Sequence, residues 1–305
     1  MHSHDFLLMG SRGLYPLAGV WGRSPHKGFV LKGDAVIKRF IKSQQVLMLI
    51  GIVFLLVSYA NEPLTVAPQR RVTVTVLTYH SVMSHEFYYP RYVENPWVLH
   101  EDVFYEQMRF LYENNFTSLS AEQFMGFLFY GEELPPNPIL ITFDDGYLDN
   151  YLFAAPIMRK FGFTGMNFLI TGDIPESTPQ TPFGVHLYMS AAELIGAADV
   201  FEYGSHTHAM HFMDDDVAAL EFKSIGEIQE DIRQSFESFL TFPGFAYPFG
   251  RHSRNAINAL RSEGVRFAFT TQWGYVNQNT NPFRLPRFSV ASDLNMEQFI
   301  RIVAG

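Results

Sequence analysis

The sequence predicts an α/β fold, either a parallel sheet or a barrel, for residues 72–305 of the 305-residue chain. Apolar, β-branched runs of strand length alternate with stretches of helical periodicity, and no internal repeat is present. Polar clusters recur where a predicted strand passes into a loop, at His80, Asp144–Asp145, His206–His211 and Pro248–Gly250. Because α/β proteins place their sites at the carboxyl ends of parallel strands, this pattern favours an enzyme.

The strands and helices follow from composition and periodicity. Strands are predicted where β-branched and apolar residues gather, in residues 71–80, 139–143, 164–171, 201–206, 245–250 and 265–271. Helices are predicted from apolar residues at helical spacing, in residues 100–115, 120–131, 147–162, 190–198, 219–240 and 254–264. Ser120 is expected to cap the second helix, Gly162 to end the third, and Pro156 to kink the third.

Composition limits the class of protein. The apolar content of 47% and aromatic content of 16% predict a folded chain with a sizeable core. A formal net charge of −9 argues against nucleic acid as a partner, because phosphate binding needs a basic patch. The chain has no cysteine, which excludes disulfides, thiolate chemistry and cysteine-ligated zinc.

The region before residue 72 divides into three parts. Residues 1–40 form a tail whose first 35 residues lack periodicity, and an alternative is that translation starts at Val36. Residues 41–61 contain the uncharged apolar run VLMLIGIVFLLVSYA, preceded by Lys38, Arg39 and Lys42. This run predicts a transmembrane anchor or a cleaved signal segment, with the catalytic part outside, and a soluble core helix is the alternative. Residues 62–71 form a polar linker.

The stretch ITFDDGYLDNY places two carboxylates, Asp144 and Asp145, at the end of an apolar run. Successive strand residues point to opposite sides, so the two acids need not share one role. One could bind a metal ion while its neighbour faces a water molecule, and a cation would relieve the repulsion between the acids. The alternative is a turn in which one aspartate caps the helix that starts near Tyr147.

Three histidines, His206, His208 and His211, follow another predicted strand in GSHTHAMH. Each alone is most simply a solvated loop residue, but three together with two carboxylates favour metal binding. Spacing does not decide which two bind, because His208 and His211 would share a face of a helix, whereas a turn removes that restriction. Two imidazoles and one carboxylate with open positions form a hydrolytic metal site, commonly of zinc.

The motifs TFDDGY, SHTHAMH and YPFG, in this order, resemble the polysaccharide deacetylase family, the NodB-homology or family 4 carbohydrate esterases. The similarity runs from about residue 72 to the C-terminus. The stretch LTYHSV and the wide His206–His211 spacing are most similar to the poly-β-1,6-N-acetylglucosamine N-deacetylase subgroup. The resemblance implies a distorted (β/α) barrel that is circularly permuted and follows an N-terminal membrane segment.

The resemblance also implies a role for individual residues. Asp144 would be the general base that takes a proton from the attacking water, and His80 the general acid that protonates the departing amine. The backbone N–H of Phe249 would help to stabilise the oxyanion. A divalent metal, most simply Zn²⁺ with Ni²⁺, Co²⁺ or Fe²⁺ as alternatives, would be held by Asp145, His206 and His211.

One departure from the family concerns the third motif. Many members have an arginine two residues before its proline, oriented onto the base aspartate, and Ala246 stands there in this chain. Arg287 is a candidate to supply that charge from another strand, with a core-edge salt bridge as the alternative. For sugar stacking, the candidate aromatic residues are Tyr147, Tyr247 and Trp273, and buried packing is the alternative for each.

The resemblance therefore implies an extracellular bacterial N-deacetylase of a polysaccharide that contains N-acetylglucosamine, such as a biofilm matrix. The alternatives are the same chemistry on peptidoglycan or chitooligosaccharides, and a catalytically inactive barrel that binds carbohydrate. A metallopeptidase is disfavoured because the chain has no His-Glu-x-x-His motif.

Overall fold

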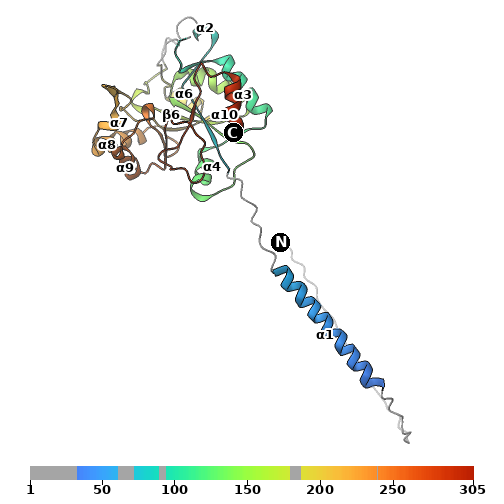
Figure 1. Ribbon diagram of the computed structural model, residues 1–305. Coiled ribbons are helices and arrows are strands. Elements are labelled where there is room, and N and C mark those ends of the chain that lie inside the picture. The colour runs from blue at the N-terminus through green and yellow to red at the C-terminus, as the bar shows by residue number, and fades with distance from the viewer. Residues whose placement is uncertain (1–32, 61–71, 89–93, 179–186, 239) are drawn as a thin grey trace, which may run out of the picture. The chain divides into compact units, whose positions relative to one another are not determined.

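The computed structural model describes residues 33–60, 72–88, 94–178, 187–238 and 240–305. The chain divides into two compact units, residues 1–69 and 70–305. In the first unit the described part is one long helix, α1 (Gly33–Ala60), drawn in Figure 1. Most of the expected tail, residues 1–32, and the expected linker, residues 62–71, lie outside the described residues.

Among the described residues, no helix combines the length and the apolar character that crossing a membrane requires. This finding does not support the expectation of a transmembrane anchor in residues 41–61.

The second unit is built on a parallel sheet, which confirms the predicted α/β class. The strand order is β11–β10–β7–β6–β5–β1–β12, and β4 pairs with β5 at the side. Every pairing in this sheet is parallel. The strands are β1 (Thr75–Tyr79), β4 (Thr117–Ser118), β5 (Pro138–Asp145), β6 (Gly165–Leu169), β7 (Phe201–Ser205), β10 (Gly244–Ala246), β11 (Phe267–Phe269) and β12 (Phe288–Ser289). Smaller pairs are β2 (Ser81–Met83) with β3 (Val98–His100), and β8 (Met213–Asp214) with β9 (Val217–Ala218).

The sheet is curled, and one segment links the strands at its two ends. Leu285 exchanges backbone hydrogen bonds with β11 and with the residue after it, at 3.0 Å to Ala268 and 2.8 Å from Thr270. Three residues later, Phe288 pairs with Leu77 of β1. Residues 285–289 therefore contact both ends of the strand order, which places Arg287 between them.

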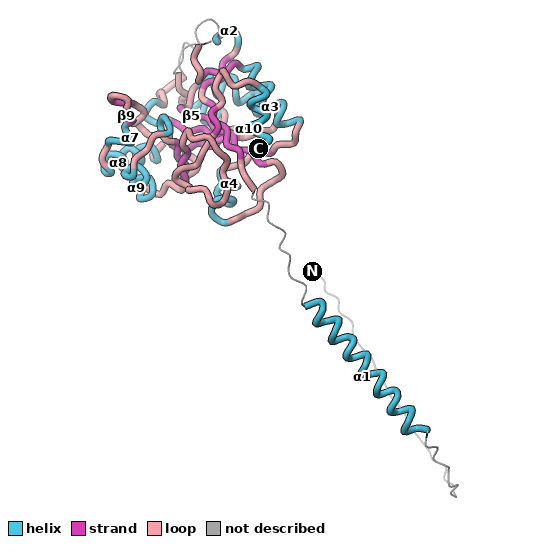
Figure 2. The backbone as a smooth tube through the Cα atoms, viewed as in Figure 1, coloured by secondary structure: helices cyan, strands magenta, loops and turns pink. Residues whose placement is uncertain are grey.

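The α-helices surround this sheet (Figures 1 and 2). They are α2 (His85–Tyr88), α3 (Glu101–Glu113), α4 (Ala121–Met125), α5 (Ala155–Phe161), α6 (Ala191–Gly196), α7 (Ala219–Phe222), α8 (Ile225–Phe236), α9 (Arg254–Ser262) and α10 (Met296–Ala304). Short 3-10 or π turns are η1 (Gly126–Tyr130), η2 (Asn150–Ala154), η3 (Thr171–Asp173) and η4 (Pro248–Gly250). The C-terminal helix α10 was not predicted.

Most predicted helix boundaries are confirmed, and two differ for identifiable reasons. Ser120 forms a capping box with Gln123, and Gly162 ends α5 in the left-handed conformation with φ 74°. The predicted helix 147–162 is split, because Pro156 lies in the first turn of α5, where its missing N–H is tolerated. The single helix predicted over 219–240 is wrong, since Ser224 caps a new helix by accepting a hydrogen bond from the Glu227 N–H.

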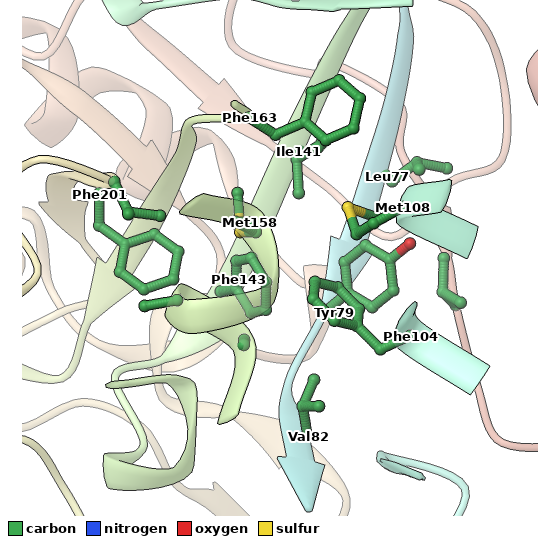
Figure 3. Close-up of a cluster of buried hydrophobic side chains, with 14 of the residues drawn as sticks. Leu77, Tyr79, Val82, Phe104, Met108, Ile141, Phe143, Met158, Phe163 and Phe201 are labelled. Atoms are coloured by element: carbon green, nitrogen blue, oxygen red, sulfur yellow. The ribbon is translucent and has the colours of Figure 1, made fainter. Parts of the chain in front are cut away.

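The core positions the strands from both faces. On one face Leu77, Tyr79, Ile141 and Phe143 point towards α3 and α5, where Phe104, Met108 and Met158 meet them (Figure 3). The rings of Tyr79 and Phe143 stack at 5.3 Å. The opposite face carries Val76, Leu140, Met166 and Phe168, packed with Phe269 inside the curl. Both faces of the sheet are covered by apolar side chains. The polar residues at the strand ends therefore gather at the carboxyl edge of the sheet.

Candidate metal centre and active site

The two adjacent aspartates at the end of β5 line the same cavity. Strand alternation would turn Asp145 away from Asp144, but Asp145 has φ 75°, in the left-handed region that strands do not use. The pleat therefore stops at Asp145, and both carboxylates are buried, with 2% and 5% of their surface exposed. The sequence argument from alternation did not anticipate this turn.

Asp144 is paired with a buried arginine. Both terminal guanidinium nitrogens of Arg287, Nη1 and Nη2, donate to its carboxylate, at 2.8 Å and 2.7 Å, and Arg287 is fully buried. Burial acts to raise the pKa of Asp144, but the Arg287 charge outweighs burial and holds this pKa well below its usual value. Asp144 is thus kept as a carboxylate. Arg287 itself does not line the cavity.

Asp145 meets two histidine rings. Its Oδ1 lies 3.4 Å from Nε2 of His206 and 3.3 Å from Nε2 of His211. Among the described residues, no donor forms a hydrogen bond with this buried Oδ1, an arrangement that is costly without a cation. Two ligand atoms about 2.0–2.1 Å from a tetrahedral zinc ion are separated by about 3.3 Å, so the three atoms fit a divalent metal. Burial and the neighbouring charge of Asp144 raise the pKa of Asp145, which a bound cation would reverse.

The protonation state of His206 also suits a ligand. Its Nδ1–H donates to the carbonyl of Ala246 at 2.8 Å, which leaves the lone pair of Nε2 directed at Asp145. Burial lowers the pKa of His206 to about 3 and also lowers that of His211, so both rings are neutral near pH 7. Ala246, noted in the sequence as the departure in the third motif, thereby contributes through its backbone.

The loop between the two histidines is held from α8. The carboxylate of Asp231 accepts the backbone N–H of His208 at 2.9 Å and that of Ala209 at 2.7 Å. Thr207, with φ 77°, starts the turn. His208 itself turns away from Asp145, and its Nδ1 lies 3.1 Å from the hydroxyl of Thr171. Among the described residues, the three that could hold a metal are Asp145, His206 and His211, which answers the question that spacing left open.

A cavity of about 350 Å³ opens above these residues. Of the residues proposed from the sequence, its wall contains His80, Asp144, Asp145, Tyr147, His206, His211, Tyr247 and Phe249. It also contains Ser81, Asn95, Trp97, Val98 and Thr271, which were not proposed. Residues 95–98 contain no recognisable motif. Their place in the cavity wall is therefore evident only from the structure, where they lie beside His80.

His80 follows β1, and hydrogen bonds to its own carbonyl and to the next two residues hold its backbone in place. Its carbonyl accepts a hydrogen bond from Asn150 Nδ2 at 2.7 Å. Asp149 holds the next two residues, through the hydroxyl of Ser81 and the N–H of Val82. The imidazole lies 4.7 Å from the ring of Trp97, between centroids.

The third motif forms a strained turn. Phe249 has φ 58° and is followed by Gly250 with φ 70°. A Cβ on Gly250 would lie 2.6 Å from the backbone nitrogen of Thr271, so only glycine fits there. The ring of Phe249 lies 4.7 Å from that of His211, and the turn therefore lies against one of the candidate metal ligands. Such strain is typical of a functional segment.

The aromatic residues proposed for sugar stacking lie in three different surroundings. Tyr147 stacks on Tyr188 and donates a hydrogen bond to Asp145, and Tyr247 is fully buried with its hydroxyl on the Phe283 carbonyl. Trp273 does not line this cavity, because it lies in a separate hollow beside Tyr275 and packs on Phe288. For Tyr147 and Tyr247, packing in the protein interior is a better explanation than contact with a sugar. Trp273 was expected to contact the sugar, but it does not lie in the cavity wall.

Residues 131–268 match the family model described as polysaccharide deacetylase. This region is a polysaccharide deacetylase domain. As a polysaccharide deacetylase, it is a hydrolase that acts on amide bonds of carbohydrates. The matched region contains the three candidate metal ligands, while His80 and Arg287 lie outside it.

Named relatives of this deacetylase come from staphylococci. The poly-β-1,6-N-acetyl-D-glucosamine N-deacetylases of Staphylococcus aureus strain MRSA252 and Staphylococcus epidermidis strain RP62A are each 26% identical over 199 residues. Each match covers 62% of this chain and 67% of the relative.

Solved structures share its fold. IcaB from Ammonifex degensii superposes with a TM-score of 0.63 at 20% identity, covering 76% of this chain and 96% of that one. A de-N-acetylase from Aggregatibacter actinomycetemcomitans gives 0.64 at 15% identity, covering 76% and 100%. The deacetylase PplD of Streptococcus pyogenes gives 0.62 at 21% identity, covering 76% and 99%.

Proposed function

We propose that this deacetylase removes acetyl groups from N-acetylglucosamine residues of poly-β-1,6-N-acetylglucosamine, in a metal-dependent reaction outside the cell. The observation that carries the metal dependence is the buried Oδ1 of Asp145, without a hydrogen bond and 3.3–3.4 Å from two neutral imidazole nitrogens. A buried anionic oxygen in this position needs a cation. The substrate follows from the names of the staphylococcal relatives.

The metal would be held by Asp145, His206 and His211, with zinc the first candidate and nickel, cobalt or iron(II) the alternatives. A divalent ion bound there would lower the pKa of a coordinated water and polarise the amide carbonyl. The donor set of two imidazoles and one carboxylate suits each of these metals.

The other residues of the site supply the proton transfers. Asp144 is kept ionised by Arg287 and lies beside the metal-binding carboxylate, so it can accept the proton of the attacking water. His80 lines the same cavity and can donate a proton to the departing amine. The backbone N–H of Phe249, in the turn against His211, is the candidate to stabilise the oxyanion. Together these steps give acetate and a free amine.

The site of action is proposed to be outside the cytoplasm. The 15-residue apolar run at residues 46–60 follows basic residues, as in the apolar region of a secretory signal. Poly-β-1,6-N-acetylglucosamine in a biofilm matrix is an extracellular polymer, so its deacetylase must be exported or tethered at the outer surface. Free amines on the polymer would be positive near neutral pH and could bind anionic cell surfaces.

Two rival functions remain testable. The first is the same reaction on β-1,4-linked peptidoglycan or chitooligosaccharides. The second is an inactive carbohydrate-binding barrel, and it is disfavoured because such a copy should have lost part of the set formed by Asp144, Asp145, His206, His211 and His80.

The test is acetate release from defined β-1,6- and β-1,4-linked N-acetylglucosamine oligomers, with and without a chelator. We expect chelator-sensitive release from the β-1,6 series. Release from the β-1,4 series alone would replace the proposed substrate by a cell-wall polymer. Absence of metal-dependent release from both series would overturn the proposal of an active deacetylase.

A further inference from the structure

An exposed tryptophan forms part of the wall of the active-site cavity next to His80. Trp97 keeps 46% of its surface exposed and lines the cavity, and the centroid of its ring lies 4.7 Å from that of His80 at a tilt of 44°. Of the other aromatic residues of the wall, Tyr147 and Tyr247 are buried, whereas Phe249 is also exposed, at 38%, and packs on His211. Single exposed aromatic residues are common on protein surfaces, but this indole lines a concave site beside the expected acid, where aromatic side chains commonly contact ligands.

The backbone around Trp97 is fixed. Its N–H donates to Oδ1 of Asn95 at 3.0 Å, and its carbonyl accepts the N–H of Ser81 at 3.1 Å. The carbonyl of Pro96 accepts the N–H of Ser292 at 2.9 Å. Trp97 is thus tied through its backbone to the residue after His80, and its ring packs against the imidazole of the expected acid. A rigid, exposed aromatic surface is what a binding platform requires.

We propose that Trp97 is the platform on which the pyranose ring being deacetylated stacks, with its acetamido group directed at Asp145 and its amide nitrogen at His80. This inference rests on the proposed function, since it assigns the sugar subsite of the same cavity. The apolar C–H face of a pyranose matches the flat face of an indole, and the electron-rich ring attracts the polarised C–H groups. This position of the sugar is consistent with the contact between Trp97 and His80, because a sugar stacked on Trp97 would lie beside the imidazole of His80.

The volume of the cavity limits what it can hold. At about 350 Å³ it is at the small end of the range of about 300–1,000 Å³ for ligand sites. One acetylated sugar can therefore enter, while the rest of a polymer must lie outside. The proposal predicts that Trp97 affects the binding of every substrate that this site accepts, from short oligomers to long ones.

The kinetic test compares Trp97→Ala and Trp97→Phe with Trp273→Ala, a matched removal of an exposed indole that does not line the cavity. With a β-1,6-linked trimer as substrate, Trp97→Ala should raise KM about tenfold, equivalent to the loss of one aromatic contact. Trp97→Phe should recover most of the affinity. Equal effects of Trp97→Ala and Trp273→Ala on KM, or no effect of Trp97→Ala, would overturn the platform.

A binding test separates this inference from the function on which it rests. In the Asp144→Asn background, where turnover is blocked, titration with the trimer should change tryptophan fluorescence. That change should disappear in the Trp97→Phe variant and persist in the Trp273→Phe variant. A fluorescence change carried by Trp97 in a protein that releases no acetate would keep the platform and reject the activity. Acetate release with a Trp97→Phe variant that retains the full fluorescence change would reject the platform and keep the activity.

Discussion

Asp144 and Asp145 are neighbours in the chain, yet their carboxylates have different charged and polar partners. Asp144 carries a bidentate Arg287, whereas Asp145 faces two neutral imidazoles with one oxygen left without a hydrogen bond. The repulsion expected between adjacent carboxylates is therefore answered on one side by an arginine. At Asp145 a cation would offset this repulsion, and the donor set could hold one.

Replacing Arg287 by methionine should lower the free energy of unfolding by about 3–5 kcal/mol, because Asp144 would remain as a buried, unpaired charge. The double variant Arg287→Met with Asp144→Asn should lose less, since it buries no uncompensated charge. Urea denaturation of the two single variants and the double variant measures this. If the effects of the single variants simply add, the pair is not the stabilising unit described above.

The loop that carries His206 and His211 depends on a different element, the helix α8. Asp231 of this helix holds two consecutive backbone N–H groups of the loop, and none of the three candidate metal ligands belongs to α8 itself.

Replacing Asp231 by alanine should weaken metal binding about 10–100-fold, the usual cost of losing a group that orients the ligands. Competition with a chelator of known affinity measures the effect on the protein. Glu230→Ala is the matched control, because Glu230 contacts Arg233 and Gln234 at the surface. Equal metal affinities of the two variants would contradict the role of Asp231.

The corner between β1 and β2 is held by Asp149 and Asn150. Burial raises the pKa of Asp149 to about 7, against the opposing hydrogen bonds from Ser81, Val82 and Asn150. The folded chain then binds this proton more tightly than the unfolded chain, whose aspartate has a pKa of about 3.9. The contribution of Asp149 to stability should therefore fall as the pH rises from about 4 to about 7.

Asp149→Asn should reduce the fall in the free energy of unfolding between about pH 5 and about pH 8, as measured by urea denaturation at several pH values. A variant whose pH dependence matches the parent chain would show that Asp149 does not titrate in this range.

For the molecule as a whole, residues 70–305 form one compact unit that contains the complete sheet and every residue of the cavity. A chain that starts at Arg70 should therefore unfold in a single cooperative transition and keep its acetate release. Calorimetry and the oligomer assay test this. A broad transition, or loss of activity in the shortened chain, would mean that the first unit contributes to the fold or the site.

The sequence predicts the fold class and most of the site because both depend on local patterns. Periodicity locates the strands, and the histidine and aspartate clusters identify their carboxyl ends. Trp97 escapes prediction since residues 95–98 reach the cavity only through the pairing of β3 with β2, which no local pattern encodes. Trp273 was misplaced because an exposed aromatic residue near a strand end gives no direction to its side chain. The left-handed turn at Asp145 was missed because strand alternation was extended one residue too far.

The central claim is that the two aspartates divide the work, Asp145 holding a metal ion and Asp144 moving a proton. Metal content and acetate release, measured side by side in Asp144→Asn and Asp145→Asn, test it most directly. We predict that Asp144→Asn keeps about one metal ion per chain and loses turnover, whereas Asp145→Asn loses both. An Asp144→Asn variant that loses its metal while Asp145→Asn retains it would contradict the assignment.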